Sequence, residues 1–227
     1  MSAHPLPETA EEASGFLDHT LLDPLAGPED VERHCAEALA LGCYGVCVAP
    51  WLLPAAVRVL KGSKVLPMTV IGFPLGVCDS TVKAHEAARA VDEGARELDM
   101  VINLGALACG EVEHVRADVA AVVAAARGRV VKAIVETGRL TDEQKTLAAQ
   151  TAVRGGASFV KTCTGFGPGA ATVDDVALLR AAVGWSVGVK ASGGVASAED
   201  MLALIRAGAD RIGASASRAI LEGFPGA

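Results

Sequence analysis

The sequence lacks the features that define several classes of protein. It has 20 basic and 27 acidic residues, with a formal net charge of −7 at pH 7. It therefore lacks the basic surface that non-specific nucleic-acid binding needs. No apolar run approaches the roughly 18 residues that cross a bilayer, and residues 1–12 contain neither the basic nor the apolar region of a signal peptide. We expect a cytoplasmic protein that binds neither nucleic acid nor membranes.

Motifs for disulfides, metals and nucleotides are also missing. The six cysteines form no CxxC pair, so we expect reduced thiols. The five histidines form no HExxH or similar cluster, which argues against a metal site. No GxxxxGK[ST] loop occurs, so a nucleoside triphosphate is not implied. We expect the protein to use no metal and no other cofactor.

The sequence does contain a regular alternation of short apolar segments with alanine-rich segments of helical period. This alternation predicts strands at 16–22, 44–49, 65–73, 97–103, 130–137, 158–164, 186–191 and 211–214. Between them it predicts helices near 28–41, 52–61, 79–94, 111–127, 141–155, 173–183, 197–207 and 215–222. Asp79, Thr141 and Ser197 have the side chains of helix N-caps.

Eight strand-then-helix units without a break in composition predict an α/β protein, a single (β/α)8 TIM barrel over residues 1–227. Residues 1–14 would form an N-terminal extension or helix, and residues 223–227 a short tail. The alternative is an open doubly wound sheet. A GxGxxG motif usually follows the first strand of such a sheet, and this sequence has none there.

Side-chain alternation places several charged residues inside the predicted barrel. Residues two apart on a strand share a face. Lys132, Lys161 and Lys190 therefore lie opposite faces that are almost wholly apolar, and Asp99 shares its face with Glu97. Barrel enzymes carry their chemistry at the C-terminal ends of the strands, where most of these groups fall. We expect them to converge on one site.

Such lysines suggest covalent chemistry, because a buried lysine needs a partner or a task. Burial and a second ammonium nearby both favour the neutral amine, which is a nucleophile for carbonyl groups. We predict that Lys161 and Lys190 form an activated pair for Schiff-base formation, and that Asp99 moves the protons this reaction requires. The alternative is a structural lysine, neutralised in an ion pair with Asp99, Glu97 or Glu136.

Three glycine-rich turns follow the last predicted strands, at 164–169, 192–194 and 213–215. Backbone N–H groups in such turns hold phosphate, and the ends of the seventh and eighth strands are the usual phosphate position in a barrel. The turns favour a phosphorylated substrate.

Cys47, in the second strand, shares the interior with the lysines. We interpret it as a packed core thiol. The alternative is a thiol close enough to an aldehyde substrate to react with it.

Seven stretches of the sequence, taken in order, resemble the deoxyribose-phosphate aldolase family. The resemblance runs from residue 17 to about residue 220. The stretches are LDHTLL at 17–22, VCVAP at 46–50, VIGFPLG at 70–76, ELDMVINLG at 97–105, VKAIVETG at 131–138, FVKTCTGF at 159–166 and VKASGGV at 189–195.

This resemblance implies a class I aldolase that cleaves 2-deoxy-D-ribose 5-phosphate reversibly to acetaldehyde and D-glyceraldehyde 3-phosphate without a metal. Lys161 would form the Schiff base, Lys190 would favour its neutral form, and Asp99 would donate and accept protons. The resemblance also implies a homodimer. The residues it assigns to the sugar are Asp18, Thr20, Cys47, Lys132 and Thr164, and those it assigns to the phosphate are Gly165, Gly193, Gly194, Gly213 and Ser215.

The sequence departs from the family pattern at three places. The usual Thr-Ser-Thr-Gly has Cys163 in place of its serine, and Ala216 replaces the second of two serines in the phosphate turn. The tail at 222–227 lacks the tyrosine that assists proton transfer in some members, and Tyr44 is the only tyrosine of the chain. These departures would affect rate rather than the type of reaction.

Two other functions stay open. One is a different Schiff-base aldolase of the same architecture, acting on another phosphosugar or a keto acid. The other is a non-catalytic barrel that binds phosphosugars as a sensor or scaffold. The intact lysines and Asp99 count against the second.

Overall fold

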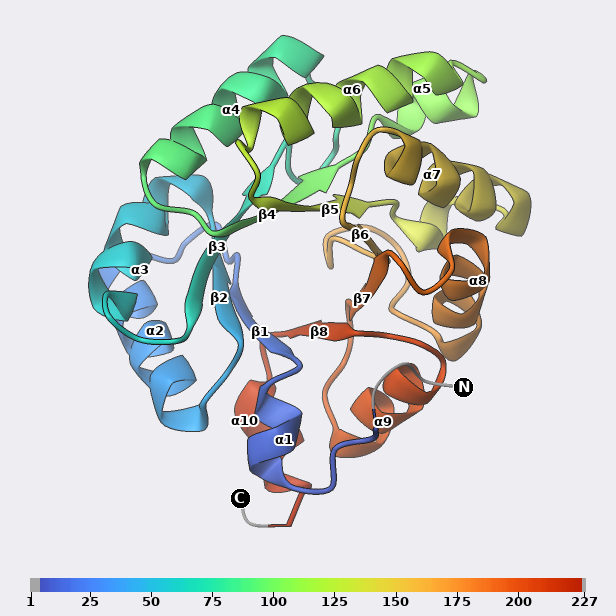
Figure 1. Ribbon diagram of the computed structural model, residues 1–227. Coiled ribbons are helices and arrows are strands. Elements are labelled where there is room, and N and C mark those ends of the chain that lie inside the picture. The colour runs from blue at the N-terminus through green and yellow to red at the C-terminus, as the bar shows by residue number, and fades with distance from the viewer. Residues whose placement is uncertain (1–4, 226–227) are drawn as a thin grey trace.

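The structure is a computed structural model that describes residues 5–225. Its strands form one closed barrel in the order β1 to β8, and each strand is parallel to its neighbours. Figure 1 looks into the ring of strands, with the helices outside it. β8 pairs with β1, which closes the sheet. The TIM-barrel prediction is confirmed, and the open doubly wound sheet is wrong.

The strands lie where the sequence predicts them, but several end earlier. Apolar residues continue past the strands into the loops of the C-terminal edge, so periodicity alone overestimates strand length. The bounds are β1 Leu17–Leu21, β2 Gly45–Val48, β3 Leu66–Ile71, β4 Glu97–Val101, β5 Val130–Ile134, β6 Phe159–Lys161, β7 Gly188–Ser192 and β8 Arg211–Ala214.

The helices follow the predicted order, and the bounds of α2 and α8 are those predicted. All three proposed N-caps accept a backbone N–H from the first turn of their helix. Short 3-10 turns occur at Pro50–Leu52 and Thr137–Arg139. The bounds are α1 Ala10–Ser14, α2 Pro28–Leu41, α3 Leu53–Leu60, α4 Ser80–Asp92, α5 Leu104–Ala108, α6 Val112–Ala125, α7 Asp142–Arg154, α8 Val173–Val183, α9 Ala198–Arg206 and α10 Ser217–Glu222.

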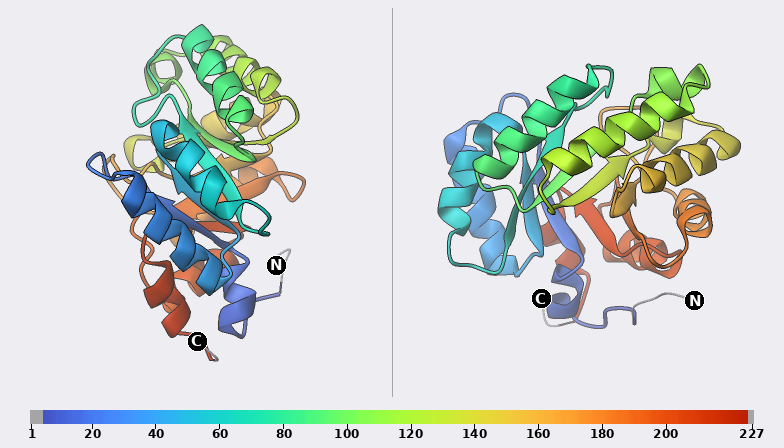
Figure 2. Two further views of the ribbon diagram at one scale, coloured as in Figure 1. Left: turned by 90° about the vertical axis from the view of Figure 1, so that its left-hand side faces the viewer. Right: turned by 45° about the horizontal axis from the view of Figure 1, so that its top comes forward.

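Two short helices add detail to the predicted pattern. No sequence pattern predicts α5, because five residues are too few to show a helical period. Within the predicted 1–14 segment, of which residues 1–4 lie outside the described part, α1 packs against α10, and Figures 1 and 2 show the pair beside the barrel. The N–H of Ala10 donates to the carbonyl of Pro225 at 3.2 Å. The start of α1 therefore lies against Pro225, the last described residue; residues 226–227 of the predicted tail lie outside the described part.

β6 is three residues long because side chains replace its ladder beyond Lys161. The Thr162 hydroxyl donates to the Ser192 carbonyl at 2.9 Å and accepts the Ser192 N–H at 3.0 Å. The Ser192 hydroxyl donates to the carbonyl of Cys163 at 2.7 Å. These bonds fix the turns after β6 and β7 relative to each other, next to Lys161.

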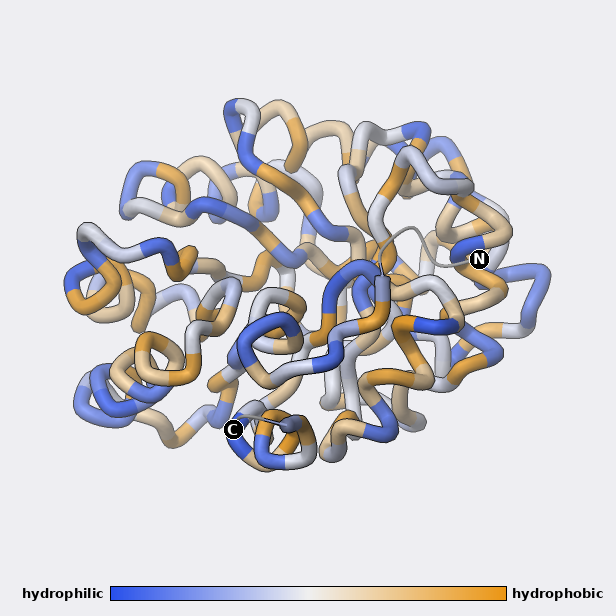
Figure 3. Tube along the Cα trace, turned by 60° about the horizontal axis from the view of Figure 1, so that its bottom comes forward, coloured by the Kyte–Doolittle hydropathy of each residue, from blue (hydrophilic) through white to orange (hydrophobic). Residues whose placement is uncertain are grey.

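Two apolar cores lie next to the charged interior, one outside the barrel and one inside it. The larger lies between strands and helices, and the outer helices alternate between hydrophobic and hydrophilic positions in Figure 3, as expected for helices with one face on a barrel. The smaller core, inside the barrel along β2 and β3, is formed by Cys47, Met68 and Val70. Among residues 5–225, no helix is long and apolar enough to span a membrane.

One ion pair lies buried between the barrel and its outer helices. Lys83 of α4 has its Nζ 2.5 Å from Oδ2 of Asp118 on α6, and donates to the Val101 carbonyl at 3.0 Å. Both side chains are at most 1% exposed. Removing one partner would leave a buried charge unpaired.

We therefore expect Lys83→Met to lower the free energy of unfolding by about 3–5 kcal/mol. The double variant Lys83→Met/Asp118→Leu removes both charges and is expected to recover most of that loss, since apolar packing replaces a buried pair at little cost. Urea unfolding of the two variants checks this. Equal destabilisation of both would contradict the role assigned to the pair.

Candidate active site

Three lysines meet around one aspartate inside the barrel. The Nζ atoms of Lys161 and Lys190 lie 2.9 and 2.8 Å from Oδ2 of Asp99, and Nζ of Lys132 lies 2.7 Å from its Oδ1. Lys132 also lies 2.7 Å from Glu97 Oε2. In the strand register Asp99 is opposite Lys132, and Lys161 is opposite Lys190. The structure thus brings together the three residues that we predicted to be catalytic.

A second group of charges completes the interior. Oδ2 of Asp18 lies 2.5 Å from Nζ of Lys190, and its Oδ1 lies 3.1 Å from Nη1 of Arg211. The Tyr44 hydroxyl donates to Oε1 of Glu97 at 3.0 Å. The Arg211 guanidinium stacks on the ring of Tyr44, 3.2 Å from its centroid. Arg211 and this role of Tyr44 were not predicted from the sequence, although alternation along β8 places residue 211 on the face of Gly213.

The carboxylates hold the buried cations in their charged form. Burial acts to lower the pKa of Lys190, but Asp18 and Asp99 beside it raise that pKa. Against the same effect of burial, three carboxylates raise the pKa of Lys132. Burial acts to raise the pKa of Asp18, but the neighbouring cations lower it to about 2, and they hold the pKa of Asp99 well below its usual range. The carboxylates beside Lys190 therefore outweigh the effect of burial on its own pKa, and the activated pair of Lys161 and Lys190 stays a prediction.

Lys161 differs from the other two lysines. Among the described residues it pairs with Asp99 alone, whereas Lys190 pairs with two carboxylates and Lys132 with three. The structural ion pair that we considered as an alternative describes Lys132. Glu136 forms an ion pair with no lysine in the described part of the chain. Of the three lysines around Asp99, Lys161 thus has the fewest carboxylate partners.

A pocket of about 350 Å³ opens above Lys161 at the C-terminal ends of β6, β7, β8 and β1. Among residues 5–225, Lys161 is the one lysine that lines it, and no arginine does. The residues predicted from the sequence that line this pocket are Thr20, Lys161, Thr164, Gly165, Gly193, Gly194, Gly213 and Ser215.

The other predicted residues lie beneath the pocket. Asp18, Asp99, Lys132 and Lys190 are fully buried, so they reach a bound molecule only through the pocket floor. Cys47 is also fully buried, and burial raises the pKa of its thiol to about 11. A protonated thiol in an apolar cluster is a poor nucleophile, which favours the interpretation as a core residue. Direct contacts of these residues with substrate stay predictions.

The glycine turns have the geometry of an anion site. Gly193 and Gly194 have φ values of 98° and 75°, a region that favours glycine. The N–H groups of Gly165, Gly194 and Ser215 make no hydrogen bond within residues 5–225. Gly213 serves differently: a Cβ there would lie 2.9 Å from Cε of Lys190. The missing side chain therefore makes room for the lysine, and a phosphate role for Gly213 stays a prediction.

Glu136 is a residue whose role here the sequence analysis missed. Its buried carboxylate accepts the Thr164 hydroxyl at 2.5 Å and the Thr164 N–H at 3.3 Å. The Thr164 hydroxyl in turn accepts the N–H of Phe166 at 3.0 Å. Glu136 itself has φ 55°, which is unfavourable for a side chain of its size. Glu136 thus fixes the turn that carries Thr164 and Gly165 beside Lys161.

We expect Glu136→Ala to lower the free energy of unfolding by about 2–3 kcal/mol, because two buried donors of Thr164 lose a charged acceptor. Glu136→Gly makes the same deletion but relieves the positive φ, so it should be about 1 kcal/mol more stable than Glu136→Ala. Urea unfolding of both variants measures the difference. Equal stability of the two would argue against strain at this position.

Two departures from the family pattern have clear positions. Cys163 is 1% exposed, with its Sγ 3.4 Å from Oγ1 of Thr137, and it lies behind Gly193 rather than on the pocket wall. Ala216 does line the pocket, next to Ser215. The change to cysteine therefore alters what supports the wall, whereas the change to alanine removes a hydroxyl from its surface.

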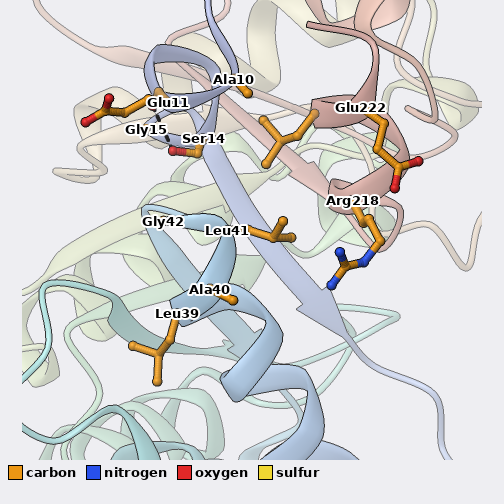
Figure 4. Close-up of a pocket in the computed structure, with 11 residues that line it drawn as sticks. Ala10, Glu11, Ser14, Gly15, Leu39, Ala40, Leu41, Gly42, Arg218 and Glu222 are labelled. Atoms are coloured by element: carbon orange, nitrogen blue, oxygen red, sulfur yellow. Dashed lines mark hydrogen bonds between the residues drawn. The ribbon is translucent and has the colours of Figure 1, made fainter. Parts of the chain in front are cut away.

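A larger hollow, about 630 Å³, lies near the N-terminal ends of β1 and β2, between α1, α2 and α10. Figure 4 shows that Glu11, Arg218 and Glu222 provide its charged groups. None of the predicted site residues lines it. In the described part of the chain, no group of three or more histidine, cysteine, aspartate or glutamate side chains could hold a metal ion.

The chain is similar in sequence to known aldolases. A family model described as DeoC/LacD family aldolase matches residues 14–223. A deoxyribose-phosphate aldolase of Carboxydothermus hydrogenoformans is 50% identical over 213 residues, covering 92% of this chain and 93% of that protein. One from Thermococcus kodakarensis is 49% identical over 218 residues, covering 94% and 97%.

Solved structures of aldolases are similar to this chain in fold. A deoxyribose phosphate aldolase from Aeropyrum pernix, described as having a unique tetrameric structure, superposes with a TM-score of 0.88 at 34% identity, covering 94% of this chain and 91% of its own. A sialic acid aldolase of Ruminococcus gnavus, at 14% identity and a TM-score of 0.62, covering 88% of this chain and 68% of its own, shares the fold alone.

Proposed function

Because this chain belongs to the DeoC/LacD aldolase family and is a lyase of the deoxyribose-phosphate aldolase type, we propose that it forms a Schiff base through Lys161. The proposed reaction is the reversible cleavage of 2-deoxy-D-ribose 5-phosphate to acetaldehyde and D-glyceraldehyde 3-phosphate. One observation carries the choice of Lys161. Of the three buried lysines around Asp99, it is the one with a single carboxylate partner and with access to the pocket.

The chemistry follows from a free amine at the pocket floor. The Lys161 nitrogen attacks the aldehyde carbon of the open-chain sugar, and loss of water gives the imine. A base then removes the proton of the C3 hydroxyl, the C2–C3 bond breaks, and its electrons enter the protonated imine to form an enamine. D-Glyceraldehyde 3-phosphate leaves with the new carbonyl. Protonation of the enamine and addition of water then release acetaldehyde and the amine.

Asp99 and Lys190 are the groups proposed to move protons. Both lie within one hydrogen bond of the Lys161 network, since Asp99 Oδ2 accepts from Lys161 and from Lys190. Because the pKa of Lys190 is raised, it remains an ammonium that can donate a proton and that disfavours a second positive charge nearby. Positioned proton transfer of this kind typically accelerates a reaction by about 10²–10⁴-fold.

The phosphate is proposed to lie on the turns after β6, β7 and β8. The unbonded N–H groups of Gly165, Gly194 and Ser215 line the pocket there, and such groups bind phosphate oxygens. Thr20 and Thr164 line the same pocket nearer the sugar. Asp18, Lys132 and Cys47 are proposed to contact the sugar from beneath the pocket.

We also propose a homodimer in the cytoplasm. Support comes from large apolar side chains that remain exposed in the loops after β1, β2 and β3, namely Leu25, Trp51, Leu75 and Val77. Exposed apolar side chains commonly mark an interface where they gather into one patch. Light scattering coupled to size exclusion gives the mass in solution.

The proposed function is tested by trapping the imine. Incubation with acetaldehyde and sodium borohydride should add one ethyl group to Lys161, located by peptide mapping. The same preparation should convert 2-deoxyribose 5-phosphate in preference to other phosphosugars and to keto acids. A protein that binds phosphosugars without an adduct or turnover would instead be a sensor or scaffold, and a preference for another donor would indicate a different aldolase.

A further inference from the structure

We propose that Arg211, which reaches the site only through other charged groups, is a positioning residue that keeps the Lys161 amine in its neutral, nucleophilic form. This inference rests on the proposed function, because it assigns a cause to the reactivity of Lys161. Arg211 is 7% exposed and does not line the pocket. It therefore contacts neither the aldehyde nor the phosphate of the proposed substrate.

Arg211 is held in place from three sides. Its Nη1 lies 3.1 Å from Oδ1 of Asp18 and 3.7 Å from Oε2 of Glu97. Its guanidinium lies over the Tyr44 ring, and at 5.8 Å from the ring centroid of Phe159. Because guanidinium remains charged under all ordinary conditions, this contact set fixes one permanent positive charge at the bottom of the site.

The charges of the interior can be counted strand by strand. β1 contributes Asp18, β4 contributes Glu97 and Asp99, and β2 and β3 contribute no charged side chain but a buried thiol and apolar groups. The basic groups are Lys132 on β5, Lys161 on β6, Lys190 on β7 and Arg211 on β8. Glu136, in the turn after β5, is a further buried carboxylate, but within residues 5–225 it bonds to Thr164 and to no lysine. Within the described residues the cluster joined by ion pairs, which excludes Glu136, therefore holds four bases and three carboxylates.

The surplus base is Lys161. The pKa values of Lys190 and Arg211 are raised by the carboxylates that bind them, and Lys132 contacts all three carboxylates. These three cations balance the three carboxylates without any contribution from Lys161. A protonated Lys161 would be a fourth positive charge, and its one carboxylate, Asp99, is shared with Lys132 and Lys190. An excess of positive charge in a buried site is costly in a medium of low dielectric constant. Arg211 thus pairs with Asp18 and Glu97. The negative charge of the cluster is then balanced before Lys161 is protonated.

A charge series tests this inference. The measured quantity is the rate at which acetaldehyde and cyanoborohydride convert Lys161 to its ethylated form, as a function of pH. Acetaldehyde does not titrate, so the midpoint of the acid limb reports the enzyme. Imine formation expels water, and hydride from the reagent then reduces the carbon of the imine to a secondary amine.

Arg211→Met leaves three bases and three carboxylates in the cluster. The midpoint of the acid limb should therefore move upward by at least about one pH unit, which makes the reaction roughly tenfold slower at a given pH on that limb. Glu97→Gln leaves four bases and two carboxylates, so the midpoint should move downward. The double variant Arg211→Met/Glu97→Gln restores a surplus of one and should return to the wild-type midpoint. Arg211→Lys retains the charge and should also keep the wild-type midpoint.

The inference is overturned if Arg211→Met leaves the midpoint unchanged, or if both single substitutions move it in the same direction. If Arg211→Met does not fold, as judged by circular dichroism, the downward shift in Glu97→Gln and its reversal in the double variant still decide the matter. Failure of the proposed function looks different, because wild-type protein would then form no ethyl adduct at Lys161 at any pH.

Discussion

Lys161→Met is expected to abolish turnover of 2-deoxyribose 5-phosphate, with a loss of at least about 10⁴-fold, because the covalent nucleophile is gone. The fold should survive. Lys161 pairs with Asp99 alone, and its removal leaves three bases facing three carboxylates. Methionine is similar in length and apolar, so the free energy of unfolding should stay close to that of the wild type.

A matched variant separates the nucleophile from its charge. Lys161→Arg places a permanent cation above Asp99 but supplies no nucleophilic amine, so it should be as inactive as Lys161→Met and give no adduct. Steady-state rates and peptide mapping after borohydride treatment measure both. Activity of Lys161→Arg within tenfold of the wild type would mean that residue 161 acts through charge, and the Schiff-base proposal would fail.

Asp99→Asn should reduce both activity and stability. Its carboxylate lies within 3 Å of three lysine nitrogens, and amide substitution leaves four bases with two carboxylates. We expect the free energy of unfolding to fall by about 3–5 kcal/mol. If Asp99 also transfers protons, kcat/KM should drop by about 10²–10⁴-fold. Urea unfolding and steady-state kinetics give the two quantities.

Two comparisons separate the roles of Asp99. Adding Lys161→Met to Asp99→Asn removes one uncompensated base, so part of the lost stability should return. Asp99→Glu keeps the carboxylate and should recover activity better than Asp99→Asn does. Loss of stability in Asp99→Asn with kcat/KM unchanged within tenfold would show a counter-ion that takes no part in proton transfer.

The sequence could locate the interior lysines and Asp99, but it could not predict the role of Glu136. Alternation along single strands was enough to place Lys132, Lys161, Lys190 and Asp99 inside one barrel, because the period of a strand is two and one face of each strand is apolar. Their convergence on Asp99 needed only the order of neighbouring strands. Glu136 was harder, because it follows its strand in a left-handed conformation that no periodicity describes.

The sequence by itself determined the barrel, the inward lysines and the glycine turns, since hydrophobic period and turn chemistry are local properties of the chain. It also carried the family resemblance. Only the tertiary structure decided which lysine has a single carboxylate partner and shares it with two other lysines. Charge balance is a sum over β1, β4, β5, β6, β7 and β8, and Arg211 enters that sum through Asp18 and Glu97, from positions 193 and 114 residues away along the chain.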